Sequence, residues 1–80
     1  YFGDALLEVA YTSFIGNVQH NGPDSELHWA KEKSTDHADC ILRHLKDRGT
    51  VDTDGVRHSA KVAWRALALL QIEIEKERST

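Results

Sequence analysis

The sequence is poor in cysteine, proline and methionine, and it lacks any long apolar run. It contains one cysteine, one proline and no methionine among 80 residues. Because the sequence starts at Tyr1 and has no methionine, we expect natural N-terminal residues to precede it. A single cysteine, Cys40, cannot close an internal disulfide, which fits a reducing compartment such as the cytoplasm. No apolar run approaches the roughly 20 residues that span a bilayer, so we expect no membrane span.

An excess of positive charge is also lacking. The formal net charge is -3, from 10 basic and 13 acidic side chains. Nucleic-acid-binding domains usually carry a strong basic excess, so we expect no nucleic-acid partner. Any basic site in this chain must therefore be local.

Helical periodicity dominates the sequence, and no segment has the alternation of a β-strand. The chain is predicted to be all-α, with residues 1–80 forming a single small domain whose core is thin. The first helix is expected from about Asp4 to Ile15, because Gly16 and Asn17 favour a helix end. Residues 18–33 are expected to form a loop, with one short helical turn near residues 27–31.

The second and third helices are predicted to form an antiparallel hairpin, because only residues 50–55 connect them. The second helix is expected to begin at residues 34–36 and to end at Gly49. The third is expected over about residues 56–77, and its middle is apolar around most of its circumference. Because three helices cannot bury such a surface, we expect the unit to assemble into a homo-oligomeric helical bundle.

The apolar spacing also predicts which side chains face the core. For the first two helices these are Leu7, Ala10 and Phe14, then Ala38, Ile41, Leu42 and Leu45. For the third helix they are Val56, Ala60, Ala63, Leu67, Leu70 and Ile74, with a second row of Val62, Ala66 and Leu69. Trp64 is expected in the core or at an interface.

A basic stripe runs along the third helix. His58, Lys61 and Arg65 lie at positions i, i+3 and i+7, one above another on the same face. No acidic residue occurs between Gly55 and Ile72, so the stripe has no ion-pair partner within its own helix. Burying it unpaired would be costly, so it needs an acid from another segment, water or an anionic ligand.

Histidine and aromatic side chains elsewhere could complete an anion site. On the second helix, His37 and His44 flank the apolar row. The preceding loop adds His28, Trp29, Lys31 and Lys33. An aromatic plane among cations suits the stacking of a base together with the neutralisation of phosphate. The alternative for each basic side chain is that it simply reaches solvent from a buried helix.

A structural metal site is not expected, although Asp36, His37, Asp39, Cys40 and His44 crowd one helix. His37 and His44 are separated by about 10 Å along a straight helix axis, too far to share an ion. Cys40 and His44 have suitable spacing, but no second ligand pair is evident elsewhere in the sequence.

Two blocks of the sequence resemble a known family. The run TDHADCILRHL, followed by DTDGVRHSAKVAWRALALLQIE, resembles the small, mostly bacteriophage-encoded proteins of the dATP/dGTP diphosphohydrolase N-terminal domain family. Upstream, GNVQHNGPDSELHWAKEKS resembles the family's loop, which has a G-N-x-x-H-N motif followed by H-W. The resemblance implies an all-helical nucleotide-binding fold of the MazG and HisE sort, dimeric or higher, in the cytoplasm of an infected bacterial host. It implies purine deoxynucleoside triphosphates as candidate ligands.

The residues that match the family motifs extend the candidate site. The predicted ligand-binding residues are His20, Asn21, His28, Trp29, His37, Arg43, His44, His58, Lys61 and Arg65. We expect Lys61, Arg65 and His58 to clamp phosphate. His37 and His44 are expected to donate hydrogen bonds, and Trp29 to stack on the base.

The sequence departs from MazG-type enzymes where the chemistry would occur. Those enzymes hold magnesium with an E-E-x-x-E helix and an E-x-x-D helix, and neither motif is present. Binding without hydrolysis is therefore favoured, with no cofactor, and its purpose would be to sequester a nucleotide signal of host defence.

Two alternatives remain open. One is a Mg²⁺- or Mn²⁺-dependent diphosphohydrolase that releases pyrophosphate, with Glu8, Asp36 and Asp39 as metal ligands. The other is a structural or protein-binding helical bundle. In that case the basic stripe would pair with acids of another copy, such as Glu73, Glu75 or Glu77.

Overall fold

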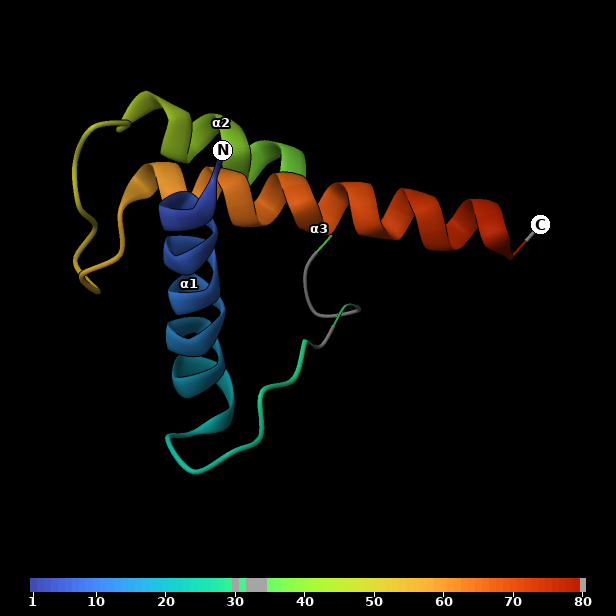
Figure 1. The fold of residues 1–80 in the computed structure, drawn as a ribbon, viewed down its shortest axis with the longest axis horizontal. Helices are drawn as coiled ribbons and strands as arrows, with labels where there is room; N and C mark the ends of the chain where they lie inside the picture. Colours follow the sequence, from blue (N-terminus) through green and yellow to red (C-terminus); the bar gives the residue numbers. More distant parts are fainter. Residues whose placement is uncertain (30, 32–34, 80) are drawn as a thin grey trace.

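The chain folds as three helices that pack around a small interior. The structure is a computed structural model that describes residues 1–29, 31 and 35–79. Over these ranges it contains α1 (Gly3–Asn21), α2 (His37–Lys46) and α3 (His58–Arg78), and no strand. Helix α2 lies along the first half of α3, α1 packs against α3 and extends away from it at a steep angle, and the second half of α3 projects beyond both (Figure 1). The all-α prediction is confirmed, and none of the described helices is long and apolar enough to cross a membrane.

Helix α1 continues past the end that the sequence predicted. It runs through Gly16 and Asn17 and ends before Gly22, whose φ of 90° is readily adopted by glycine. The buried amide of Asn17 donates to the carbonyl oxygen of Ser25 at 3.2 Å and accepts from the backbone N–H of His28 at 3.2 Å. Asn17 therefore satisfies the backbone of the following loop and does not end the helix.

Other predicted boundaries are wrong by a few residues. Helix α1 begins after Phe2 and not at Asp4. Helix α2 begins after Asp36, whose side chain makes no capping hydrogen bond, and it ends before Gly49 is reached. The predicted helical turn near residues 27–31 is absent from residues 27–29, whereas Lys31 has 3₁₀-helical conformation; residues 30 and 32–34, including Lys33 and Ser34, lie outside the described residues.

The predicted core faces of α1 and α2 point outward. The exposed side chains include Leu7, Ala10 and Phe14 of α1 and Ala38, Leu42 and Leu45 of α2. Helix α2 instead buries His37 and Cys40, with Ile41 half-buried beside them. His37 contacts Arg65 of α3, so a polar side chain takes part in the interior in place of the predicted apolar row.

Only the first half of α3 has the buried seam that the sequence predicted. Val56, just before the helix, and Ala60 are buried, whereas Leu67 and Leu70 are exposed. Ala68, which belonged to neither predicted row, is buried in their place. The difference arises because α2 covers only the first half of α3 and leaves the projecting half uncovered (Figure 1).

Candidate functional site

An open groove of about 870 Å³ is lined by all three helices and by the segment before α2. The predicted site residues that line it are His20, Asn21, His28, Trp29, Arg43, His44, Lys61 and Arg65. Of the predicted set, His37 and His58 alone are not part of its lining. Residues from segments far apart in the sequence therefore meet on one concave surface.

Two tryptophans form an aromatic wall of the groove. The rings of Trp29 and Trp64 meet edge to face, with centroids 5.7 Å apart. The indole Nε1–H of Trp64 donates to Oγ of Ser13 on α1 at 2.6 Å. Trp64 is half-buried and lines the groove, so it belongs to the candidate site as well as to the helix packing that the sequence predicted.

Side chains from the second half of α1 line the groove but were missed at the sequence level. Thr12 and Ser13 lie within the predicted helix, whereas Asn17 and Gln19 lie there because the helix continues beyond Ile15. The polar side chains between Thr12 and Asn21 could have indicated this face, but Gly16 and Asn17 together favoured a helix end. Asn17 also accepts a 2.8 Å hydrogen bond from the Asn21 amide, which fixes both side chains.

Arg43 and Arg65 bring two guanidinium groups to the groove. Arg43 is exposed on α2 and donates to Sγ of the buried Cys40 at 2.9 Å. Arg65 is about a quarter exposed and lies 3.9 Å from a carboxylate oxygen of Asp36. Its guanidinium also lies 5.7 Å from the ring centroid of Trp64. Five N–H donors allow one arginine to hold several partners at once.

His37 is a buried neutral histidine at the α2–α3 contact. Its Nδ1 lies 3.1 Å from Nη1 of Arg65, and because a guanidinium only donates, Nδ1 must accept. The ring hydrogen is then at Nε2, which is buried and has no hydrogen-bond partner among the described residues. Burial, and then the charge of Arg65, lower the pKa of His37 below its usual 6.5.

We expect acid to destabilise the fold partly through His37. Its pKa is lowered in the folded state, so the unfolded chain binds more protons as the pH falls below about 6.5. The contribution of His37 is complete above that pH and is lost as the pH falls toward the folded pKa. Urea unfolding of wild type and His37→Gln between pH 8 and pH 5 should therefore show a smaller loss in the variant. Identical losses would contradict the assignment.

Lys61 is held by two carboxylates of its own chain. Its ammonium lies 2.6 Å from Oδ2 of Asp52 and 2.8 Å from Oδ2 of Asp54. The hydrogen bond from Lys61 lowers the pKa of Asp52 to about 2. Although burial opposes the charged form of Lys61, the two carboxylates outweigh it and raise the pKa of that lysine. The basic stripe thus receives its acids from the turn before α3, and Lys61 is largely neutralised.

The turn that carries these acids is fixed by its own hydrogen bonds. The backbone N–H of Asp52 donates to the carbonyl of Val56 at 2.8 Å, and Gly55 turns the chain with a φ of 81°. The carboxylate of Asp52 accepts from the N–H of Thr53 at 2.7 Å, and that of Asp54 accepts from Val56 at 3.1 Å. Both acids are therefore oriented before they meet Lys61.

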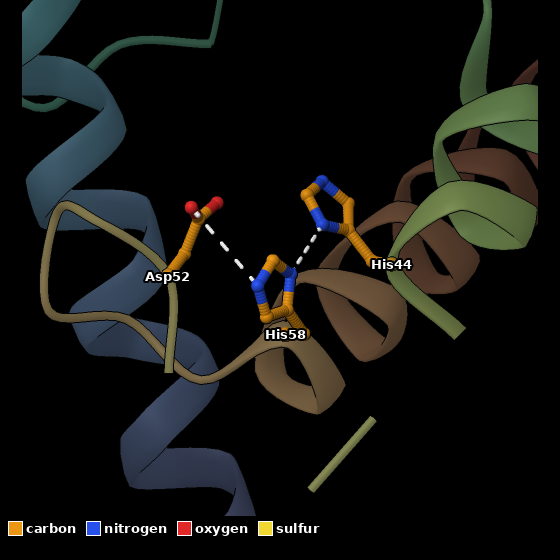
Figure 2. A group of neighbouring side chains, drawn as sticks. All are labelled: His44, Asp52 and His58. Atoms are coloured by element: carbon orange, nitrogen blue, oxygen red, sulfur yellow. Dashed lines mark hydrogen bonds and ion pairs between the residues drawn. The ribbon is translucent and has the colours of Figure 1, made fainter. Parts of the chain in front are cut away.

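His44, His58 and Asp52 converge at one end of the α2–α3 pair, as Figure 2 shows. Nδ1 of His44 lies 2.9 Å from Nδ1 of His58, and Nε2 of His58 lies 4.0 Å from Oδ1 of Asp52. The sequence showed no second ligand pair to join Cys40 and His44. Folding supplies a histidine and a carboxylate from outside the helix of His44.

The carboxylates expected as metal ligands of an enzyme do not converge. Among the described residues, the one group of three potential metal ligands is His44, Asp52 and His58, so it contains none of Glu8, Asp36 and Asp39. Glu8 lies instead 4.0 Å from Nε of Arg57. The fold therefore does not bring Glu8, Asp36 and Asp39 together as one group of ligands.

Comparison of the chain with protein-family models, with curated proteins and with solved structures gives no match.

Proposed function

We propose that this chain binds a phosphorylated purine nucleotide in the groove and holds it without hydrolysis. The observation that carries the proposal is that one concave surface collects most of the predicted ligand-binding residues. Its volume of about 870 Å³ lies within the range of roughly 300–1,000 Å³ that is typical of small-molecule sites. The resemblance to phage-type proteins supports a role in sequestering a nucleotide signal of host defence, in the cytoplasm of an infected bacterium.

The division of roles in the groove follows from its charges. Arg43 and Arg65 are the proposed phosphate contacts, because guanidinium groups match phosphate oxygens in geometry and in charge. Trp29 and Trp64 are the proposed base contacts, since every base has a face that stacks on an indole. The sequence predicted Lys61 as a phosphate contact. Because Asp52 and Asp54 already neutralise its ammonium group, Lys61 has only a supporting role in phosphate binding.

Binding is favoured over diphosphohydrolase activity by the placement of the acids. Hydrolysis of a triphosphate by Mg²⁺ or Mn²⁺ needs several carboxylates that converge on the metal ions. Glu8, Asp36 and Asp39 do not form such a group.

A nucleotide panel tests the proposal directly. The protein is incubated with purine mono-, di- and triphosphates and cyclic dinucleotides, with and without Mg²⁺ or Mn²⁺, then desalted, denatured and analysed by mass spectrometry. The expected result is recovery of an intact purine nucleotide. Conversion to a monophosphate and pyrophosphate would establish an enzyme, and recovery of no nucleotide would refute binding.

Arg65→Ala should weaken binding of the recovered nucleotide at least roughly tenfold, because charge-assisted hydrogen bonds contribute about 1.5 to 3 kcal/mol. Isothermal titration calorimetry measures the change. The matched control is Arg78→Ala, which removes an exposed arginine at the end of α3 that does not line the groove. Equal affinities for both variants would remove Arg65 from the site.

The proposal also includes an assembled state. Two side-chain contacts support an antiparallel α2–α3 hairpin. Near the end of α2, His44 contacts His58 at the start of α3, and at the start of α2, His37 contacts Arg65 farther along α3. The exposed apolar faces of all three helices support burial of these faces against further copies, in an oligomeric bundle.

A further inference from the structure

We propose that His44, His58 and Asp52 form a binding site for one divalent transition-metal ion of the zinc class. Each residue offers one ligand atom, and the three atoms lie within 4.8 Å of one another. The inference is independent of the nucleotide proposal, because it concerns different side chains apart from His44 and can be tested without nucleotide.

The three ligands come from three neighbouring pieces of backbone (Figure 2). His44 lies in the last turn of α2, His58 is the first residue of α3, and Asp52 belongs to the turn between them. The side chains of His58 and Asp52 are only 12% and 25% exposed. Helix packing and the hydrogen-bonded turn therefore position the site, and it does not depend on long flexible side chains.

The spacing of the two imidazoles suits one shared ion. Zinc binds imidazole nitrogen at about 2.0–2.1 Å, so a tetrahedral ion holds two such nitrogens about 3.3 Å apart. The observed Nδ1–Nδ1 separation between His44 and His58 is 2.9 Å, so an ion needs only a few tenths of an ångström of widening there. The carboxylate of Asp52 lies on the other side of the His58 ring, 4.0 Å from Nε2. Because an imidazole binds one ion through one nitrogen, Asp52 becomes the third ligand when the His58 ring turns so that a single nitrogen faces both His44 and Asp52.

The surrounding charge favours a cation. Asp52 and Asp54 carry two negative charges and Lys61 carries one positive charge, which leaves a net charge of -1 in this contacting cluster when both imidazoles are neutral. Lys61 binds Oδ2 of Asp52, while Oδ1 is the oxygen nearest to His58. Lys61 on Oδ2 and the backbone N–H of Thr53, which donates to Oδ1 at 2.7 Å, together orient the carboxylate with Oδ1 on the side of His58, as residues behind a metal ligand commonly do.

The ligand types select the class of metal. Two imidazoles and one carboxylate suit zinc, cobalt, nickel or copper, whereas magnesium and calcium prefer oxygen ligands alone. Three protein ligands leave a tetrahedral ion with one position for water or another ligand. His44 also lines the groove, so an ion bound to it lies at the edge of that groove.

Metal binding is tested on the whole chain with Zn²⁺ in competition with a chromophoric chelator, and by native mass spectrometry for stoichiometry. One ion per chain is expected, and His44→Gln, His58→Gln and Asp52→Asn should each weaken binding by roughly a hundredfold. The matched control is Asp47→Asn, which removes an exposed carboxylate beyond the end of α2. It should bind zinc as the wild type does.

Spectroscopy with Co²⁺ provides a second measurement. An ion held by two imidazoles and a carboxylate in four-coordinate geometry gives intense visible absorption, which His44→Gln should abolish. Circular dichroism checks that each variant keeps its helices, and if the other substitutions prevent folding, the half-exposed His44 decides alone. Absence of zinc binding, or unchanged affinity in folded His44→Gln, would overturn the proposal.

Discussion

Lys61→Met is expected to lower the free energy of unfolding by roughly 2 to 3 kcal/mol. Methionine keeps the aliphatic length of lysine but removes the ammonium between Asp52 and Asp54. Two carboxylates, each only about a fifth to a quarter exposed, are then left without their cation. For a domain of this size, the melting temperature should fall by roughly 10 to 20 °C, measurable by circular dichroism.

The control for this substitution is Lys46→Met, which removes an exposed lysine in the last turn of α2. It should change stability by less than about 0.5 kcal/mol, as most surface substitutions do. If Lys61→Met melts at the wild-type temperature while its nucleotide affinity collapses, the ammonium serves a ligand and not the turn. The supporting role assigned to Lys61 would then be wrong.

Ala66→Glu is expected to separate the assembled protein into monomers. Ala66 and Leu69 lie near the middle of α3, are exposed in the single chain, and do not line the groove. If this row packs against another copy, a glutamate there becomes a buried, unpaired charge that costs about 3 to 5 kcal/mol. The dissociation constant should rise by about three orders of magnitude. Light scattering should give at least two copies for the wild type and one for the variant.

Ser59→Glu is the matched control, because it places the same charge at an exposed polar position in the first turn of α3. It should keep the wild-type mass. A wild type that is monomeric at micromolar concentration would refute the assembly. An Ala66→Glu protein that stays oligomeric would show that the subunits meet through another surface.

The all-α fold class was predictable because the helical spacing of apolar residues is present in the sequence however the helices are arranged in space. The inward faces of the helices were not predictable, because apolar spacing shows which side of a helix is hydrophobic but not which side packs against a neighbouring helix. Leu7 and Leu42 are exposed, while the small interior consists of Cys40, Val56, Ala60 and Ala68 with the polar Asn17 and His37. In an assembled protein the apolar side is still satisfied, by a partner that one sequence does not reveal.

The candidate site was predictable in composition but not in pairing. The absence of acids between Gly55 and Ile72 indicated that the basic stripe needs an acid from another segment, water or an anionic ligand, and for Lys61 the structure supplies the acids. The sequence did not show that the turn before α3 would supply these acids. The positions of Asp52 and Asp54 depend on the geometry of that turn, which its hydrogen bonds and Gly55 determine. The approach of His44 to His58 likewise depends on how α2 lies against α3, which residue spacing within one helix cannot show.

The aromatic wall allows binding in the groove to be followed by the tryptophan fluorescence of the protein. The sequence contains two tryptophans, and both Trp29 and Trp64 line the groove, with their rings in edge contact. The intrinsic indole fluorescence of the chain therefore originates entirely at this surface. A molecule that enters the groove changes the polarity and quenching around both emitters at once, so occupancy can be followed without a dye or a label.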